Sequence, residues 1–186
     1  MNSAFANLFL ALQARIAAIV LDPLATPTVP AIKHIDQDFG QMEDHNGNNR
    51  PPVTFPCILI DINSATFTDY SQNAQSGNCK VVLRLGFTPY SSSAMATPTD
   101  YKEKAIAYYD IEYLLHQALQ PWSPDGDTGN TFGAMNRISA VSENREDFLR
   151  VRAIIYDIAF EDFSTKTQIT LSPASIHLTD QFDFNI

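Results

Sequence analysis

The segment EDFLRVRAIIYDIAFEDF, residues 146–163, constrains the fold most, because it reads as a strand with apolar side chains on both faces. Successive side chains of a strand point to opposite faces. Odd-numbered positions near its start are apolar: Leu149, Val151, Ala153 and Ile155. Even-numbered positions further on are apolar as well: Ile154, Tyr156, Ile158 and Phe160. The middle of this strand therefore needs an apolar cover on each side.

Two arrangements would supply both covers. A β-bulge near residues 153–156 would rotate the apolar set so that one core serves the whole strand. Alternatively, helices cover one face and a second subunit covers part of the other. The same pattern recurs in FPCILIDI, residues 55–62, where a second bulge would be needed. The sequence therefore favours an oligomer built through its sheets.

The first half of the chain predicts a helix followed by a hairpin. Apolar residues recur at helical spacing from Phe5 to Ile19, and Asn2 or Ser3 can cap the helix start. Three prolines then give an extended connector, and QMEDHNGNNRPP, residues 41–52, reads as an exposed loop. Strands over 53–62 and 80–87 form a hairpin, with the first continuing into 65–70. Gly77 and Asn78 supply its turn.

The second half predicts a long helix and another hairpin. The helix runs from about Pro98 to Gln120, with Thr97 as its N-cap and a buried stripe at helical spacing. A strand over residues 135–144 then pairs with the segment 146–163. The order α-β-β-α-β-β predicts an α+β domain over residues 1–164, with a mostly antiparallel sheet and helices packed on one face. Residues 165–186 form a C-terminal extended arm or an added strand.

Charge and cysteine content exclude several classes of protein. The formal charge of -9, with only twelve scattered basic residues, argues against a specific nucleic-acid-binding surface. Cys57 and Cys79 are too few for a disulfide framework, so we expect free thiols. Gln13 and Arg15 interrupt the N-terminal apolar run, which therefore predicts an amphipathic helix instead of a secretory signal or a membrane span.

No pattern of catalytic or metal-binding residues emerges from the sequence. His34, His45, His116 and His177 stand far apart without ligand partners, and we expect His116 to be a solvated or edge residue. DGDTGN, starting at Asp125, lacks the glycine and glutamate positions of a calcium loop and predicts a turn. Nucleophile and phosphate-loop motifs are absent. We therefore expect no enzyme activity, no cofactor and no metal.

The C-terminal residues alternate like a strand with one buried face. The apolar positions, interrupted only by Asp180, are Ile176, Leu178, Phe182, Phe184 and Ile186. They form either a last strand of the domain's own sheet or an arm that pairs with a neighbouring subunit. We predict that these residues contribute to a subunit interface together with Arg150, Arg152 and Tyr156.

In the order of its segments and the general character of their sequences, the chain resembles the tail terminator, or tail completion, proteins of tailed bacteriophages. The resemblance covers about residues 1–164 and rests on the N-terminal helix, the proline-rich connector, FPCILIDI, the polar-tipped hairpin, the helix YKEKAIAYYDIEYLLHQAL and the final strand RVRAIIYDIAFEDF. It includes no diagnostic motif, and the arm has no counterpart in it.

The resemblance implies a structural virion protein of the phage neck. Such proteins form a ring, commonly a hexamer, which caps the tail tube and joins it to the head connector while DNA passes through the lumen. The partners implied are further copies of the chain, the tail tube protein and the connector proteins, in the virion and, during assembly, in the host cytoplasm. Another neck or head-completion ring component is an alternative. A small-ligand-binding α+β domain, with a pocket lined by Tyr108, Trp122 and Tyr156, is a second one.

Overall fold

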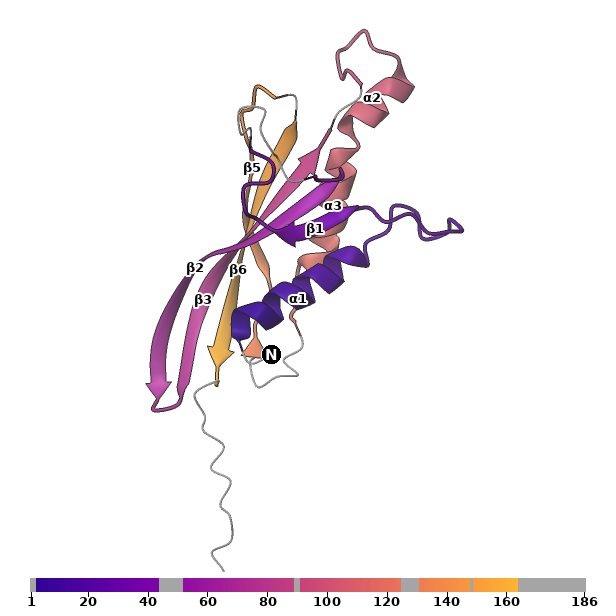
Figure 1. Cartoon of the computed structure of the whole chain (residues 1–186). Coiled ribbons are helices and arrows are strands. Elements are labelled where there is room, and N and C mark those ends of the chain that lie inside the picture. The colour runs from indigo at the N-terminus through magenta and orange to yellow at the C-terminus, as the bar shows by residue number, and fades with distance from the viewer. Residues whose placement is uncertain (1–2, 44–51, 89–90, 125–130, 148, 164–186) are drawn as a thin grey trace, which may run out of the picture.

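A computed structural model describes residues 3–43, 52–88, 91–124, 131–147 and 149–163. Within them the fold is α+β, with a mostly antiparallel sheet that curls into a half-barrel (Figure 1). The helices are α1 (Ala4–Ala17), α2 (Thr99–Ile106) and α3 (Tyr108–Leu119). The strands are β1 (His34–Gln37), β2 (Cys57–Ser71), β3 (Ala74–Phe87), β4 (Thr131–Phe132), β5 (Asn136–Ser142) and β6 (Arg150–Asp162).

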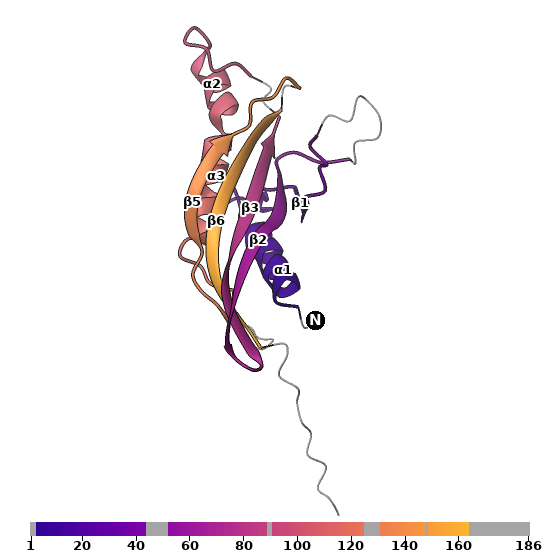
Figure 2. The same cartoon turned by 90° about the vertical axis from the view of Figure 1, so that its left-hand side faces the viewer.

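The sheet has the strand order β1-β2-β3-β6, and both β4 and β5 pair with the far side of β6 (Figure 2). The predicted α+β class and the mostly antiparallel sheet are confirmed. The predicted element order was incomplete, because it lacked β1 and β4. Since β1 runs parallel to β2, the sheet is mixed. Both missing strands are short, and a run of two to four residues shows too little alternation to predict a strand.

The helix predicted between Pro98 and Gln120 consists of two helices. α2 ends at Ile106 and α3 begins at Tyr108. The predicted cap at Thr97 is wrong, since Pro98 occupies the N-cap position and no side chain caps this helix. At the N-terminus, Ser3 caps α1 as predicted, and its Oγ accepts a hydrogen bond from the amide of Ala6.

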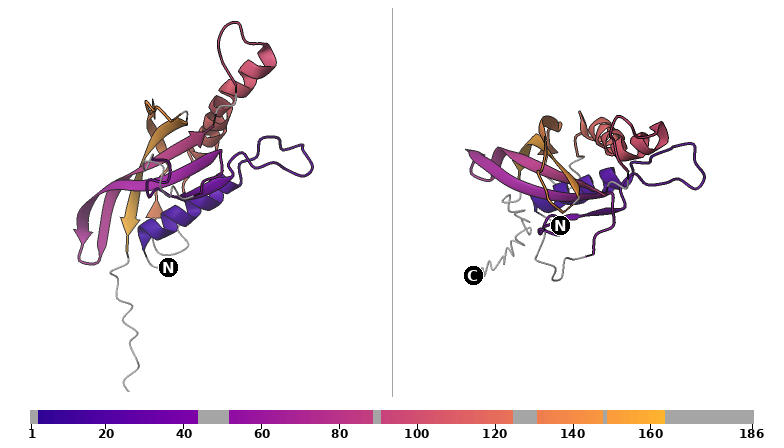
Figure 3. Two further views of the ribbon diagram at one scale, coloured as in Figure 1. Left: turned by 45° about the horizontal axis from the view of Figure 1, so that its top comes forward. Right: turned by 90° about the horizontal axis from the view of Figure 1, so that it is seen from above.

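α1 and α3 pack on one face of the sheet and build the main core there, whereas α2 extends past the end of the sheet (Figures 1 and 3). We call this the helix-side core. Its fully buried members from the helices are Leu8, Leu12, Ile16, Leu115 and Leu119. Its members from β6 are Ile154, Tyr156, Ile158 and Phe160. The even-numbered apolar set of β6 therefore finds its cover in the chain's own helices.

The hairpin β2–β3 turns at residues 72–73, and not at Gly77 and Asn78 as predicted. Gly77 lies within β3, opposite Phe67 of β2 and Phe160 of β6. A Cβ atom on Gly77 would lie 1.9 Å from the carbonyl oxygen of Thr66 and 3.0 Å from the ring of Phe160. The glycine therefore provides close approach between strands and rings and does not serve as a turn residue.

The bulge near residues 153–156, one of the two arrangements considered for this strand, does not occur in β6. β6 pairs with β3 in unbroken register from Arg150 to Asp162. The irregularities lie in other strands, in β5 between Arg137 and Ser139 and in β2 between Ile62 and Ser64 and between Asp69 and Ser71. β6 thus keeps two alternating faces, and the odd-numbered apolar set needs a separate cover.

Candidate assembly interface

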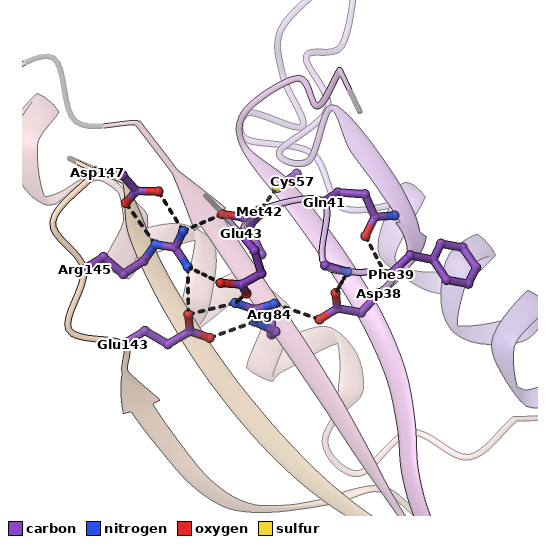
Figure 4. Close-up of polar contacts among 11 residues, drawn as sticks. Asp38, Phe39, Gln41, Met42, Glu43, Cys57, Arg84, Glu143, Arg145 and Asp147 are labelled. Carbon is purple, nitrogen blue, oxygen red and sulfur yellow. Dashed lines mark hydrogen bonds and ion pairs between the residues drawn. The ribbon is translucent and has the colours of Figure 1, made fainter. Parts of the chain in front are cut away.

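Part of the second sheet face is covered by the chain itself. The segment Asp38–Glu43, which we call the covering segment, folds over the start of β6 and places Met42 on this face (Figure 4). A second, smaller core results, with the fully buried members Met42, Cys57, Leu59 and Val151. Gln41 and Met42 are only 4% and 0% exposed, so the exposed loop predicted from Gln41 is wrong for these two residues.

A glycine makes room for this second core. Gly86 on β3 faces Met42 and Cys57, whose sulfur atoms lie 3.6 Å apart. A Cβ atom on Gly86 would lie 2.5 Å from Met42 Sδ and 2.7 Å from Cys57 Sγ. Any larger residue would therefore displace the side chains of Met42 and Cys57.

Ion pairs around Arg84 hold the covering segment down. Arg84 Nη1 lies 3.1 Å from Asp38 Oδ2, and Nη2 lies 2.6 Å from Glu43 Oε1 (Figure 4). Its Nε lies 2.7 Å from Glu143 Oε1. The Arg84 side chain is only 13% exposed. These hydrogen bonds, led by the one to Glu143, raise the pKa of Arg84 above its ordinary value despite the opposing effect of burial.

A second guanidinium extends this cluster. Arg145 contacts Asp147 Oδ2 at 2.7 Å and Glu143 Oε2 at 3.2 Å, and it donates to the main-chain carbonyl of Met42. The hydrogen bond from Arg84, followed by Arg145, lowers the pKa of Glu143. A carboxylate held ionised in this way is a poor general acid, because it does not carry a proton at neutral pH. The arrangement supports a structural role for the cluster.

The two arginines predicted at an interface lie where β6 meets α3. Arg150 packs over the ring of Tyr108 at 5.0 Å and donates to its hydroxyl at 2.9 Å. Arg152 Nε lies 2.6 Å from Glu112 Oε2. Arg150 is exposed and Arg152 is half-buried, so both keep surface that a neighbour can contact. Their role at an interface stays a prediction.

Tyr156 has a different position. Its side chain is fully buried in the helix-side core, and its hydroxyl finds no hydrogen-bond partner among the described residues. Its own chain therefore encloses it, and a neighbouring subunit has no access to this ring in the fold shown here. The other predicted interface residues, Ile176, Leu178, Phe182, Phe184 and Ile186, lie outside the described residues.

The middle of the second face has no cover from the described part of the chain. We call this surface the open face. It carries apolar residues on three adjacent strands: Val82, Val141, Ala153 and Ile155. Val141 is 56% exposed, and the other three are half-buried. The open face continues toward the hairpin tip as a shallow, more polar groove of about 670 Å³, lined in part by Thr66, Asn78 and Ala159.

One edge of the sheet is also open. β1 pairs with β2 only as far as Ile60, where the amide of Asp38 donates the last hydrogen bond. From Asp61 to Ser71, the outer side of β2 pairs with no described residue, and we call this the open edge. An apolar groove of about 440 Å³ between α1 and β2 adjoins it, lined by residues that include Phe5, Phe9, Leu10 and Ile62.

The groups considered for chemistry do not come together. His116 is half-buried, not fully solvated, and burial lowers its pKa. Cys57 and Cys79 are free buried thiols, as expected, and burial raises the pKa of each to about 11. The described ranges contain no cluster of three or more His, Cys, Asp or Glu side chains that could hold a metal ion. His45, His177 and the DGDTGN segment lie outside them.

Two further findings bear on function. No helix in the described part of the chain is both long enough and apolar enough to cross a bilayer. No protein-family model and no curated protein matches the sequence.

Proposed function

We propose that this chain is a structural virion protein of a tailed bacteriophage, a subunit of a homo-oligomeric ring that caps the tail tube and joins it to the head connector. The observation that carries the proposal is the open face. Val82, Val141 and Ile155 form an apolar surface on a sheet that its own helices cover only from the other side. Apolar surface of this kind, rimmed by polar residues, marks sites of protein association.

The geometry favours a ring over a symmetric dimer. The open face lies on one side of the sheet, and α1 and α3 lie on the other (Figure 2). An interface between these unlike surfaces is heterologous, and heterologous contacts generate rings when their rotation closes. α3 offers exposed aromatic side chains, Tyr109 and Tyr113, for such a contact. Each subunit would then use both sides of its sheet.

The charge of the chain suits a channel for DNA. A formal charge of -9 leaves no excess of cations to bind phosphates, and like charges repel the DNA backbone. DNA can then pass through a ring without being retained. The open face supports self-association but does not indicate in which assembly it occurs. The assignment of the ring to the phage neck depends on the resemblance to tail terminators.

Two matched variants test the role of the open face. Val141→Glu places a charge in the open face, whereas Val29→Glu places one on the connector, where the valine is exposed to a similar degree, 45% against 56%. We expect Val141→Glu to shift the protein toward monomer in native mass spectrometry with an unchanged circular dichroism spectrum, and Val29→Glu to assemble normally. Equal assembly of both variants would remove the open face from the interface.

A second experiment tests the tube partner. Tail tubes assembled from the tube protein of the same phage genome are mixed with the purified chain and examined by negative-stain electron microscopy. The proposal expects an added ring at one tube end and arrest of tube elongation. Tubes that elongate at the same rate with and without the chain would contradict a terminator function, even if the chain forms rings.

A further inference from the structure

The open edge of β2 has unpaired backbone groups that a further strand could bind. At about 3.4 Å per residue, the stretch from Asp61 to Ser71 presents roughly 35 Å of unpaired backbone on one side. Natural proteins protect long edges with lysine, proline, short strands or strong bulges. This edge has register irregularities near Asn63 and near Tyr70 and carries Asp61 and Asp69, but it contains neither lysine nor proline. Such an edge is a template for an added strand.

The helix-side surface along the open edge is apolar and can bind apolar side chains. Phe5, Phe9 and Leu10 of α1 line the groove that adjoins the open edge, and Leu10 is 49% exposed. Further along β2, Phe67 is also 49% exposed and packs edge-on against Phe5 at 6.1 Å. A strand added here would place every second side chain over this groove. The site therefore fits a segment that is apolar at alternate positions.

The chain contains a segment of this kind outside the described residues. Residues 174–186 alternate between apolar and polar side chains, with only Asp180 breaking the apolar set. Their length also matches the open edge. We propose that residues 174–186 of one subunit add a strand to the open edge of β2 in a neighbouring subunit, with Ile176, Leu178, Phe182, Phe184 and Ile186 facing the α1 groove. The inference rests on the proposed ring and names one contact that closes it.

The path of the chain leaves an open edge within reach, its own or that of a neighbour. Phe163 follows β6 at the hairpin tip, where its ring lies 6.4 Å from that of Tyr70 on β2. Returning to the chain's own open edge means passing β3 and β2, a distance of three strand spacings or about 14 Å. The connecting residues 164–173 reach up to roughly 33 Å when extended. This surplus lets the segment reach another subunit, and each subunit then both gives and receives one strand.

Cysteine cross-linking in the full-length chain tests this placement. Thr66→Cys marks the open edge, and Ser175→Cys, Thr179→Cys or Asp183→Cys marks a polar position of the segment. Because Thr66 and these polar positions would face the same side of the sheet, mild oxidation should join them. Glu103→Cys, at an exposed position on α2, is paired with the same three variants as the control for random collision, because α2 lies away from β2 and from the open face.

We expect at least one pair with Thr66→Cys to give covalent dimers and larger species on a non-reducing gel, at several times the yield of its Glu103→Cys control. Equal yields would overturn the placement. A monomer that migrates faster, without larger species, would show pairing within one subunit and would overturn the exchange. If native mass spectrometry still shows rings in either case, the proposed ring stands and this inference alone fails.

Two charge variants on opposite faces of the segment test the same placement without cysteines. Phe182→Asp places a charge on the face that we assign to the groove, whereas Gln181→Asp places it on the other face. Since the change removes the burial of a phenylalanine ring, the concentration for half-assembly should rise about tenfold or more for Phe182→Asp alone. A similar rise for both variants would contradict pairing as a strand.

Discussion

Arg84 and Glu143 form two hydrogen bonds, with Arg84 Nε 2.7 Å from Glu143 Oε1 and Nη2 2.8 Å from Oε2. Arg84 lies in the middle of the sheet on β3, and Glu143 directly follows β5. The same guanidinium also binds Asp38 and Glu43 of the covering segment. One side chain thus fastens the covering segment to two strands and closes the second core.

Arg84→Met should destabilise the fold strongly. The change leaves three carboxylates close together without their shared partner, and loss of hydrogen bonds to a largely buried charge costs about 2–4 kcal/mol of unfolding free energy. Urea denaturation measures this value. Lys33→Met, at an exposed lysine, is the control and should stay within about 0.5 kcal/mol of the parent. Equal effects of the two changes would show that the cluster contributes little.

The stability of the fold should fall in acid through Glu143. Its pKa is lowered from the ordinary value of 4.5, mainly by the hydrogen bond from Arg84. The unfolded chain therefore binds a proton at a pH where the folded chain does not, so the stabilisation is present above pH 4.5 and is lost as the pH falls through the folded pKa.

Glu143→Gln checks this assignment. The variant should have a lower unfolding free energy at pH 7 than the parent and a shallower loss of that free energy between about pH 5 and pH 3, on either side of the ordinary carboxyl pKa. The measurement is urea denaturation at each pH. Glu103→Gln, on the exposed side of α2, is the matched control and should keep the slope of the parent. Parallel curves for Glu143→Gln and the parent would refute the linkage.

Gly77→Ala should cost far more than Gly133→Ala. The added methyl group on Gly77 meets the carbonyl of Thr66 at 1.9 Å, whereas on Gly133 its nearest neighbour is at 3.4 Å. We expect a loss of about 3 kcal/mol or more for Gly77→Ala, at the upper end of overpacking effects, and less than about 1 kcal/mol for Gly133→Ala. Thermal and urea unfolding compare the two. A mild effect at Gly77 would mean that β2 and β3 separate easily at this point.

Tyr156→Phe should preserve or raise stability. The Tyr156 hydroxyl is buried without a partner among the described residues, and burial raises its pKa to about 12. Removing an unsatisfied buried hydroxyl should raise the unfolding free energy by up to about 1 kcal/mol. Tyr113→Phe is the control at an exposed tyrosine, whose hydroxyl accepts a hydrogen bond from Gln117. A clear loss for Tyr156→Phe would indicate that a water or a residue outside the described ranges binds the hydroxyl.

The sequence predicted that β6 has apolar side chains on both faces and that helices cover one face. It did not predict which residues cover the other face. Alternation alone showed that Val151 and Ile154 lie on opposite faces of β6 and that each needs a cover. It did not show that Met42 covers Val151, because Met42 directly precedes an Asn-rich loop and has no periodic neighbours. The ion pair of Arg84 with Glu143 joins positions 59 residues apart, and local patterns contain no information about such contacts.

Gly77 shows a second limit of sequence patterns. A glycine followed by asparagine, in a polar run between two apolar segments, is typical of a turn. Here the strand continues through it, because Phe67 and Phe160 pack across the space that a side chain would fill. By contrast, the cap at Ser3 and the stripe of α1 were predicted correctly, since both depend on neighbours within a few residues.

The most direct test of the proposed ring is the mass of the full-length protein in solution, measured by native mass spectrometry and light scattering over a range of concentrations. We predict one closed species of several subunits, hexameric if the resemblance to tail terminators holds, which gains population as the concentration rises. A strict monomer at every concentration, with or without tail tubes, would contradict it and would leave the open face and the open edge without their proposed role.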